Sequence, residues 1–140
     1  SHNHPMFGSV GAWLYKALAG INLAPDSVGF QKILIQPQMV RDLRYAAGSV
    51  LTLRGMVSSS WWRSERKISL EVRIPVNSEA EVVLPKFNLK NMVIKEGGQI
   101  LWDSKGFRQG IPGVRGVEEK PGAFFINVGS GKYLFELEGE

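Results

Sequence analysis

His2 and His4 are the only histidines of the chain and stand two residues apart near its N-terminus, and the sequence has no cysteine. A protein metal site needs about three or four ligands, and no carboxylate is close to these imidazoles in the sequence, so we predict no metal site. A neutral imidazole can donate or accept a hydrogen bond, which suits recognition of a sugar hydroxyl. The alternative is that both histidines belong to a solvated terminus without a binding role.

Paired carboxylates are the next chemistry to consider, because hydrolysis of a glycoside needs two carboxyl groups facing each other across the scissile bond. The candidates are Glu65, Glu71, Glu79, Glu81, Asp103, Glu118 and Glu119. Glu71, Glu79 and Glu81 alternate with apolar residues, which indicates the outward face of a strand. Glu65 stands between Arg63 and Arg66 in a polar turn. We interpret all seven as solvated charges and predict no catalytic residue.

Other catalytic motifs are missing from the sequence. Residues 58–60 are three serines inside a strand-like segment, which differs from the sharp turn of a nucleophile elbow. Gly129-Ser-Gly131 has the composition of a hairpin turn, not of a phosphate-binding loop. We therefore predict no cofactor.

Trp61 and Trp62 are neighbours in a predicted strand, so their side chains must point to opposite faces. One of them can enter the core, and the other is then exposed or covered by a partner. An exposed tryptophan can stack on a sugar ring or dock on a neighbouring domain. We favour docking over sugar stacking, because the N-terminal helix described next also indicates a neighbouring domain.

The N-terminal residues predict a single amphipathic helix. The apolar residues that recur at helical spacing are Phe7, Val10, Leu14, Ala17, Leu18 and Ile21. Gly20 is a plausible stop at the C-terminal end. Small residues such as Gly8 and Ala12 allow a second helix to approach closely, although no helical partner follows in the sequence. We expect this helix to be the last element of a larger helical domain.

The remainder of the chain predicts strands and turns. The expected strands cover residues 32–37, 43–54, 56–63, 68–74, 79–85, 92–94, 99–102, 114–119, 123–128 and 132–138. Apolar residues alternate most clearly with polar ones at 68–74. Gly97-Gly98 suits a tight hairpin turn. The fold class is therefore mainly β, an antiparallel β-sandwich of about eight to ten strands preceded by one α-helix.

Composition and charge exclude several classes of function. The net charge is +4, and the basic residues are scattered and form no cluster, which argues against a nucleic-acid surface. No apolar run approaches the roughly 18–20 residues that cross a bilayer, so we expect no membrane span. With 44% hydrophobic residues, the chain can bury a core.

Several motifs resemble bacterial α-L-rhamnosidases of glycoside hydrolase family 78. Residues 3–10 (Asn-His-Pro-Met-Phe-Gly-Ser-Val) with Trp13 and residues 18–21 are similar to the end of the catalytic domain of that family. Gly29-Phe30 with Ile33, Ile35 and Pro37 resembles its linker strand, "GF-x-x-I-x-I-x-P". Later matches are Arg54-Gly55, Ser60-Trp61, Ile74-Pro75-Val76-Asn77 and residues 80–85. They follow the family's order.

The resemblance implies a fold and a function for the parent protein. Family members hydrolyse terminal α-L-rhamnosides with inversion, using two glutamates in an α/α barrel, and a C-terminal β-sandwich packs on that barrel. It implies that residues 1–29 end the barrel domain and that residues 30–140 form the sandwich. It also implies that His4 contacts the sugar at the barrel mouth and that the catalytic glutamates lie outside this chain.

The expected partners are the chain's own catalytic α/α barrel and rhamnose-containing glycans, with no nucleic acid and no membrane. A homodimer through the exposed helix is a further expectation, and light scattering would measure it. The sequence leaves the bacterial cytoplasm and the periplasm open as compartments. Two alternatives also stay open: an autonomous carbohydrate-binding module with Trp62 or Trp61 as its platform, and the equivalent sandwich of another α/α-barrel glycoside hydrolase family.

Overall fold

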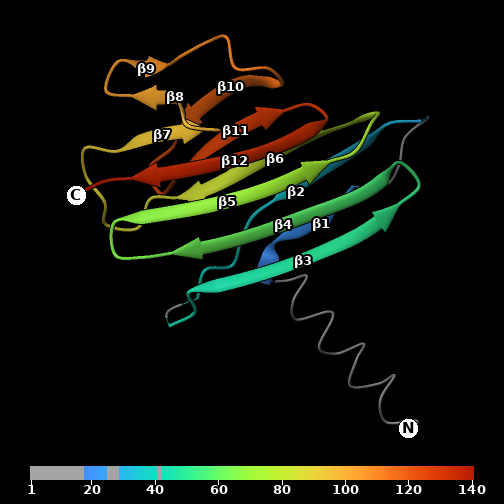
Figure 1. Cartoon of the computed structure of the whole chain (residues 1–140), viewed down its shortest axis with the longest axis horizontal. Helices are drawn as coiled ribbons and strands as arrows, with labels where there is room; N and C mark the ends of the chain where they lie inside the picture. Colours follow the sequence, from blue (N-terminus) through green and yellow to red (C-terminus); the bar gives the residue numbers. More distant parts are fainter. Residues whose placement is uncertain (1–17, 25–28, 41) are drawn as a thin grey trace, which may run out of the picture.

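The computed structural model describes residues 18–24, 29–40 and 42–140, which form two β-sheets packed face to face (Figure 1). The strands are β1 (Ile21–Leu23), β2 (Gln31–Ile35), β3 (Tyr45–Thr52), β4 (Gly55–Arg63), β5 (Lys67–Ile74), β6 (Ser78–Pro85), β7 (Val93–Glu96), β8 (Gln99–Asp103), β9 (Gly106–Phe107), β10 (Val114–Glu119), β11 (Ala123–Val128) and β12 (Gly131–Glu138). The five-stranded sheet has the order β1-β2-β6-β11-β10, and the seven-stranded sheet has the order β3-β4-β5-β12-β7-β8-β9. The prediction of a mainly β, two-sheet fold is confirmed.

The sequence located most strands to within about two residues, because period-two alternation is a local signal. In β5 the predicted inward residues Ile68, Leu70, Val72 and Ile74 are all buried. The hairpin at Gly97 and Gly98 joins β7 to β8, and both glycines have positive φ. One exception is Ser69, which is predicted to point outward and is nevertheless buried.

Two details of the predicted fold are wrong. The described residues contain twelve strands, more than the expected eight to ten. β1 starts at Ile21, which was expected to end the helix, and continues into the expected loop, and the two-residue β9 also lies in a segment expected to be a loop. The β2–β6 pair is parallel, although only antiparallel pairing was expected. The chain between these strands crosses to the other sheet as β3, β4 and β5 before it returns, which supplies the long connection that a parallel pair needs.

The predicted N-terminal helix falls almost entirely on residues 1–17, outside the described residues. In the part that the structure describes, no helix is among the regular elements, and helical backbone is confined to Leu18 and Ala19. Gly20 follows them with φ of 82°.

The core lies between the two sheets and is one contiguous cluster of buried apolar side chains. Both sheets contribute its largest members, with Trp61 and Phe135 from one sheet and Phe124 from the other. At the far end from β3, the rings of Trp102 and Phe124 make an edge-to-face contact between the sheets, with centroids 4.6 Å apart. The sheets are therefore joined along their length.

Candidate functional site

The segment Leu18–Leu23 meets the sandwich at what we call the junction. The indole N–H of Trp61 donates to the carbonyl of Leu18 at 2.8 Å, and the hydroxyl of Ser59 donates to the carbonyl of Ala19 at 2.7 Å. Both donors come from the inward face of β4 and are fully buried. Buried polar groups of this kind need partners, so the sandwich fixes the position of the incoming backbone.

Two backbone hydrogen bonds complete the junction. Gln36 N–H donates to the carbonyl of Gly20 at 2.8 Å, and Gln38 N–H donates to that of Leu18 at 3.0 Å. A Cβ at Gly20 would lie 2.1 Å from the carbonyl oxygen of Gln36, so only glycine fits there. The sequence identified Trp61, Gly20 and Pro37 as single residues but gave no sign that Ser59 and Trp61 bind a segment about forty positions earlier.

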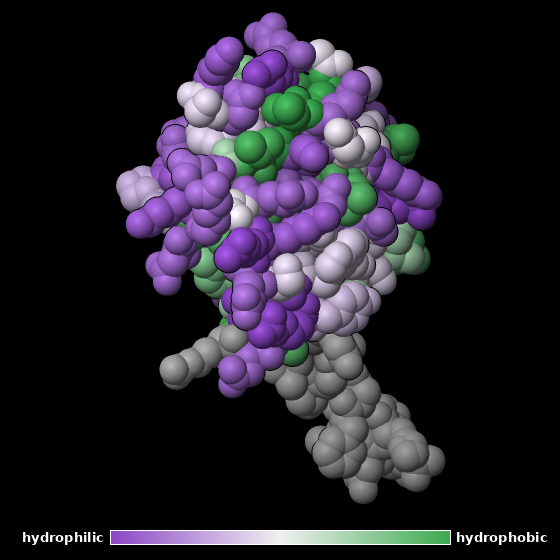
Figure 2. All heavy atoms as spheres, turned by 60° about the vertical axis from the view of Figure 1, so that its left-hand side comes forward, coloured by the Kyte–Doolittle hydropathy of each residue, from purple (hydrophilic) through white to green (hydrophobic). Residues whose placement is uncertain are grey.

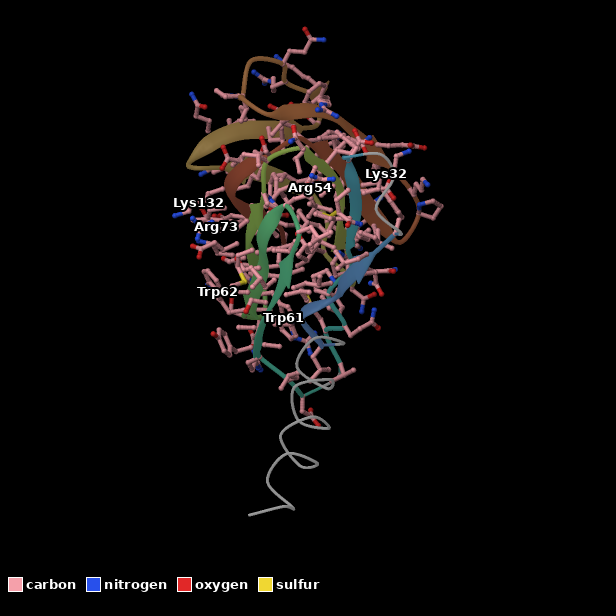
Figure 3. All side chains as sticks on the ribbon, turned by 90° about the vertical axis from the view of Figure 1, so that its right-hand side faces the viewer. Lys32, Arg54, Trp61, Trp62, Arg73 and Lys132 are labelled. Atoms are coloured by element: carbon pink, nitrogen blue, oxygen red, sulfur yellow. The ribbon has the colours of Figure 1, made fainter. Side chains whose placement is uncertain are left out.

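A second feature is the outward surface of β3, β4, β5 and β12, which we call the outer face. Tyr45 and Trp62 are cross-strand partners on it, with 57% and 41% of their surfaces exposed. Figure 3 shows Trp62 on the same side of the seven-stranded sheet as Arg73 and Lys132, and Trp61 between the sheets. The prediction that the two tryptophans take opposite environments is confirmed, and Trp61 is excluded as a surface platform.

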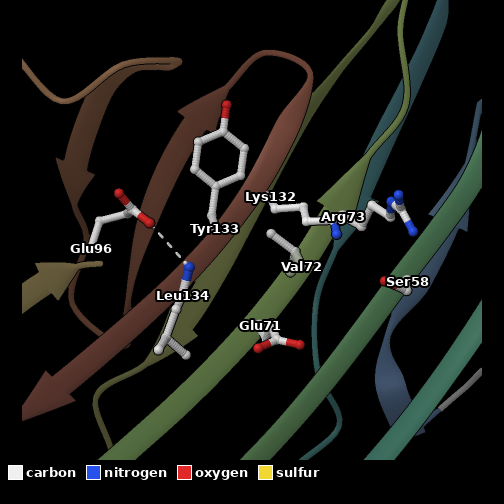
Figure 4. A pocket seen from close by; sticks show the side chains of 8 residues that line it. All are labelled: Ser58, Glu71, Val72, Arg73, Glu96, Lys132, Tyr133 and Leu134. Carbon is white, nitrogen blue, oxygen red and sulfur yellow. Dashed lines mark hydrogen bonds between the residues drawn. The ribbon is translucent and has the colours of Figure 1, made fainter. Parts of the chain in front are cut away.

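A depression of about 440 Å³ opens on the outer face at Ser58, farther along β4 from the aromatic pair (Figure 4). Its lining includes Ser58, Glu71, Arg73, Glu96 and Lys132. Glu96 accepts the backbone N–H of Leu134 at 3.1 Å. Among the described residues, the exposed side chains of Glu71, Arg73 and Lys132 make no ion pair or hydrogen bond with one another or with a neighbour.

Tyr133 also lines the depression, but it acts as a structural group. Burial raises the pKa of its hydroxyl above the usual 10.0, with a smaller contribution from the charge of Glu96. The hydroxyl donates to the carbonyl of Gly129 at 3.0 Å. It is therefore a neutral donor near pH 7 and unsuited to proton transfer there.

None of the seven candidate carboxylates is buried, in agreement with their interpretation as surface charges. Glu79 pairs with Arg115 at 2.6 Å, Glu119 pairs with Lys86 at 2.7 Å, and Asp103 pairs with Arg108. A hydrogen bond from the backbone N–H of Lys105 lowers the pKa of Asp103, and Arg108 lowers it further. A glycosidase acid requires a raised pKa, so the environment of Asp103 has the opposite effect.

The predicted sugar contact, His4, lies outside the described residues. Within 18–24, 29–40 and 42–140, no three His, Cys, Asp or Glu side chains gather as a metal site would require. The same part of the chain contains no helix with the length and apolar character to cross a membrane.

Comparison with known proteins decides the family. The family model described as "Bacterial alpha-L-rhamnosidase C-terminal domain" matches residues 20–99, which is more than half of the chain. The chain belongs to this family. The matched range begins at the junction glycine and includes both Ser59 and Trp61.

Individual relatives agree with this assignment. The chain is 33% identical over 103 residues to an α-L-rhamnosidase of Alteromonas sp. (strain LOR), and the match covers 69% of this chain and 11% of that protein. It is 35% identical over 85 residues to one from Streptomyces avermitilis, with 61% of this chain and 8% of that protein covered.

Solved structures give the same result. The α-L-rhamnosidase of Dictyoglumus thermophilum superimposes with a TM-score of 0.72 at 39% identity, covering 99% of this chain and 14% of that chain. The Streptomyces avermitilis α-L-rhamnosidase complexed with L-rhamnose superimposes with a TM-score of 0.64 at 26% identity. This match covers 93% of this chain and 11% of that chain. This chain spans about a tenth of the length of these relatives. The activity and the substrates of those longer proteins are therefore only proposed for the protein to which this chain belongs.

Proposed function

We propose that this chain is the accessory β-sandwich of a larger α-L-rhamnosidase, that it packs on a separate catalytic α/α barrel, and that it has no hydrolase activity of its own. The junction is the observation that carries this proposal. Four hydrogen bonds of 2.7–3.0 Å hold residues 18–20, and two of the donors are buried side chains. This arrangement fixes the direction in which an upstream domain would leave the sandwich.

The remaining parts of the proposal concern residues near or before the junction. Residues 1–29 would end the barrel domain with its last helix, and residues 30–140 would form the sandwich. The pairing of β1 (Ile21–Leu23) with β2 ties the end of the first segment to the second. His4 would contact the sugar at the barrel mouth, and the helix could also join two copies of the chain.

Lack of activity follows from the carboxylates available in the described residues. Glu119 and Glu79 are each ion-paired with a basic side chain, Lys86 and Arg115. An inverting or retaining glycosidase instead needs two carboxyl groups that face the same glycosidic bond. An assay with a chromogenic α-L-rhamnoside should give no turnover above the blank with this chain alone.

Docking can be tested in trans. The Dictyoglumus thermophilum relative, with the part that matches this chain removed, would be mixed with this chain. We expect the two to migrate together in size-exclusion chromatography and the melting temperature of the truncated relative to rise, because a partner that binds only the folded state stabilises it. Turnover by the isolated chain, or two species that never associate, would contradict the proposal.

A matched pair of surface variants locates the contact. Leu23 in β1 is 40% exposed at the junction, and Ile100 in β8 is 43% exposed in the other sheet near its far edge. Leu23→Asp should weaken association by about tenfold or more, because it places a charge in an apolar contact. Ile100→Asp should leave association unchanged.

The family match decides against one alternative, the equivalent sandwich of another α/α-barrel hydrolase family. The other alternative, a carbohydrate-binding role, is favoured by a separate observation, the exposed aromatic pair Tyr45 and Trp62 on the outer face.

A further inference from the structure

The aromatic pair Tyr45 and Trp62 offers a place for a sugar ring. Arg63 N–H donates to the carbonyl of Arg44 at 3.0 Å, so the next cross-strand pair, Tyr45 and Trp62, is of the non-hydrogen-bonded type. In that type the facing side chains lie closer together. Two partly exposed aromatic side chains therefore stand beside each other at one end of β3 and β4.

The rows next to this pair are occupied by small residues. Ala47 pairs with Ser60, and Ser49 pairs with Ser58, all with side chains on the outer face. Small side chains leave a low floor that leads from Trp62 to the depression at Ser58. The distance from Trp62 to Ser58 is about 13 Å, at roughly 3.3 Å per residue. This length exceeds one sugar ring and suits a short chain of them.

The side of this floor carries both hydrogen-bond donors and hydrogen-bond acceptors. Glu71 is the cross-strand partner of Ser60, and Arg73 is the partner of both Ser58 and Lys132. Glu71 can only accept hydrogen bonds, whereas Arg73 and Lys132 can only donate them. All three are exposed, and no described residue bonds to their side chains. A ligand that both donates and accepts, such as a sugar hydroxyl, satisfies such a set.

We propose that the outer face binds a neutral oligosaccharide, with one ring stacked on Trp62 and Tyr45 and hydroxyl groups hydrogen-bonded to Glu71, Arg73 and Ser60. An acidic ligand fits less well, because Glu71 and Glu96 line the same depression as Arg73 and Lys132. A protein partner or a second copy of the chain also fits less well, because serine, alanine and charged side chains lie between Trp62 and the depression. Figure 2, in which the outer face is seen only obliquely, shows a mainly hydrophilic surface with small separate hydrophobic patches.

This proposal goes beyond the accessory role and reverses the preference for docking through Trp62. The reason is geometric: Trp61, on the inward side of β4, binds the incoming chain, whereas Trp62 lies on the opposite side among small and polar residues. The site stands whether or not the sandwich docks on a barrel. If it does dock, the site could hold a part of the glycan away from the cleaved bond.

Titration of the full chain tests the proposal. The probes are a linear tetrasaccharide of α-linked L-rhamnose, maltotetraose as a second neutral glycan, and tetragalacturonic acid as an acidic one, followed by calorimetry and tryptophan fluorescence. We expect saturable binding of at least one neutral probe. Binding of the acidic probe alone, or of none at millimolar concentration, would overturn the proposal.

Variants identify the surface that binds. Trp62→Ala and Tyr45→Ala should each weaken binding by about tenfold or more, whereas Trp62→Phe should retain most of it, because an aromatic ring remains. Leu53→Ala, at an apolar side chain that is 91% exposed beyond the end of β3, should change nothing. Equal binding by Trp62→Ala and the unaltered chain would place the sugar elsewhere and reject this site. So would self-association that is lost in Trp62→Ala, because the face would then belong to a dimer.

These outcomes are independent of the accessory role, since binding is measured on this chain without a catalytic domain. Failure to bind sugar would leave the docking of the sandwich untouched. Failure to dock would leave the sugar site untouched.

Discussion

The adjacent residues Trp61 and Trp62 have different roles because strand geometry sends their side chains to opposite faces. Trp61 is buried and donates its indole N–H to Leu18, and Trp62 is partly exposed on the outer face. The same alternation separates Ser59, which is buried and bonded to Ala19, from Ser60, which is half-buried on the outer face. Identical residue types thus lie in different environments within one segment of β4.

Ser59→Ala tests the junction at the scale of one residue. The substitution leaves the buried carbonyl of Ala19 without this donor, which should lower the free energy of unfolding by about 1–3 kcal/mol. The matched control is Ser60→Ala on the same strand, which should change stability by less than about 0.5 kcal/mol. Urea denaturation followed by circular dichroism measures both. Equal effects of the two substitutions would mean that the hydrogen bond to Ala19 contributes nothing.

The strand β1 is the element that connects the upstream segment to the sandwich. It pairs with β2 over three residues, from Ile21 opposite Ile35 to Leu23 opposite Ile33. Its sequence, Ile-Asn-Leu, is too short and mixed to predict a strand, and it forms because Gly20 turns the chain at φ of 82° against Gln36. Its stability therefore depends on the turn that precedes it.

Gly20→Ala tests this turn, and Gly98→Ala is its matched control. The two glycines have similar φ values of 82° and 88°, but a Cβ at Gly98 meets nothing within 4 Å. Gly98→Ala should cost only the left-handed backbone strain, about 1–2 kcal/mol. Gly20→Ala carries that strain plus a clash with the Gln36 backbone and should cost clearly more. Thermal unfolding measures the melting temperatures of the two variants. Similar values would show that the backbone at the junction accommodates a Cβ at position 20 without loss of stability.

At the scale of the whole molecule, one core joins both sheets. The parallel pair β2–β6 joins the β1–β2 pair to the rest of the five-stranded sheet, after the chain has formed three strands of the other sheet. Trp61 lies in the core near the junction, and Trp102 contacts Phe124 at the other end. Neither sheet can bury its inner face without the other. We therefore expect the sandwich to unfold as a single unit.

Denaturation followed by two probes tests this expectation. Tryptophan fluorescence reports on the four tryptophans of the chain, Trp61 and Trp102 among them, and far-ultraviolet circular dichroism reports on the strands as a set. The two transitions should coincide, and the calorimetric and van't Hoff enthalpies should agree. Separate transitions would show that the sandwich does not unfold as a single unit.

The sequence by itself determined the positions of the longer strands, the two faces of β5 apart from Ser69, and a resemblance to the family that the comparisons then showed. These follow from alternation and from local motifs, which need no knowledge of distant contacts. It also separated Trp61 from Trp62, because neighbouring side chains in a strand must diverge, although it did not determine which of them is buried.

Only the tertiary structure decided which segments meet. The parallel pairing of β2 with β6, the capture of Leu18 and Ala19 by Trp61 and Ser59, and the placement of Tyr45 beside Trp62 all join residues distant in the chain. Each of these contacts depends on strand register and on packing between the sheets. A local alternation of polar and apolar residues is compatible with several registers and pairings, so it does not determine them. For that reason, both the junction and the candidate sugar site could be identified only from the tertiary structure.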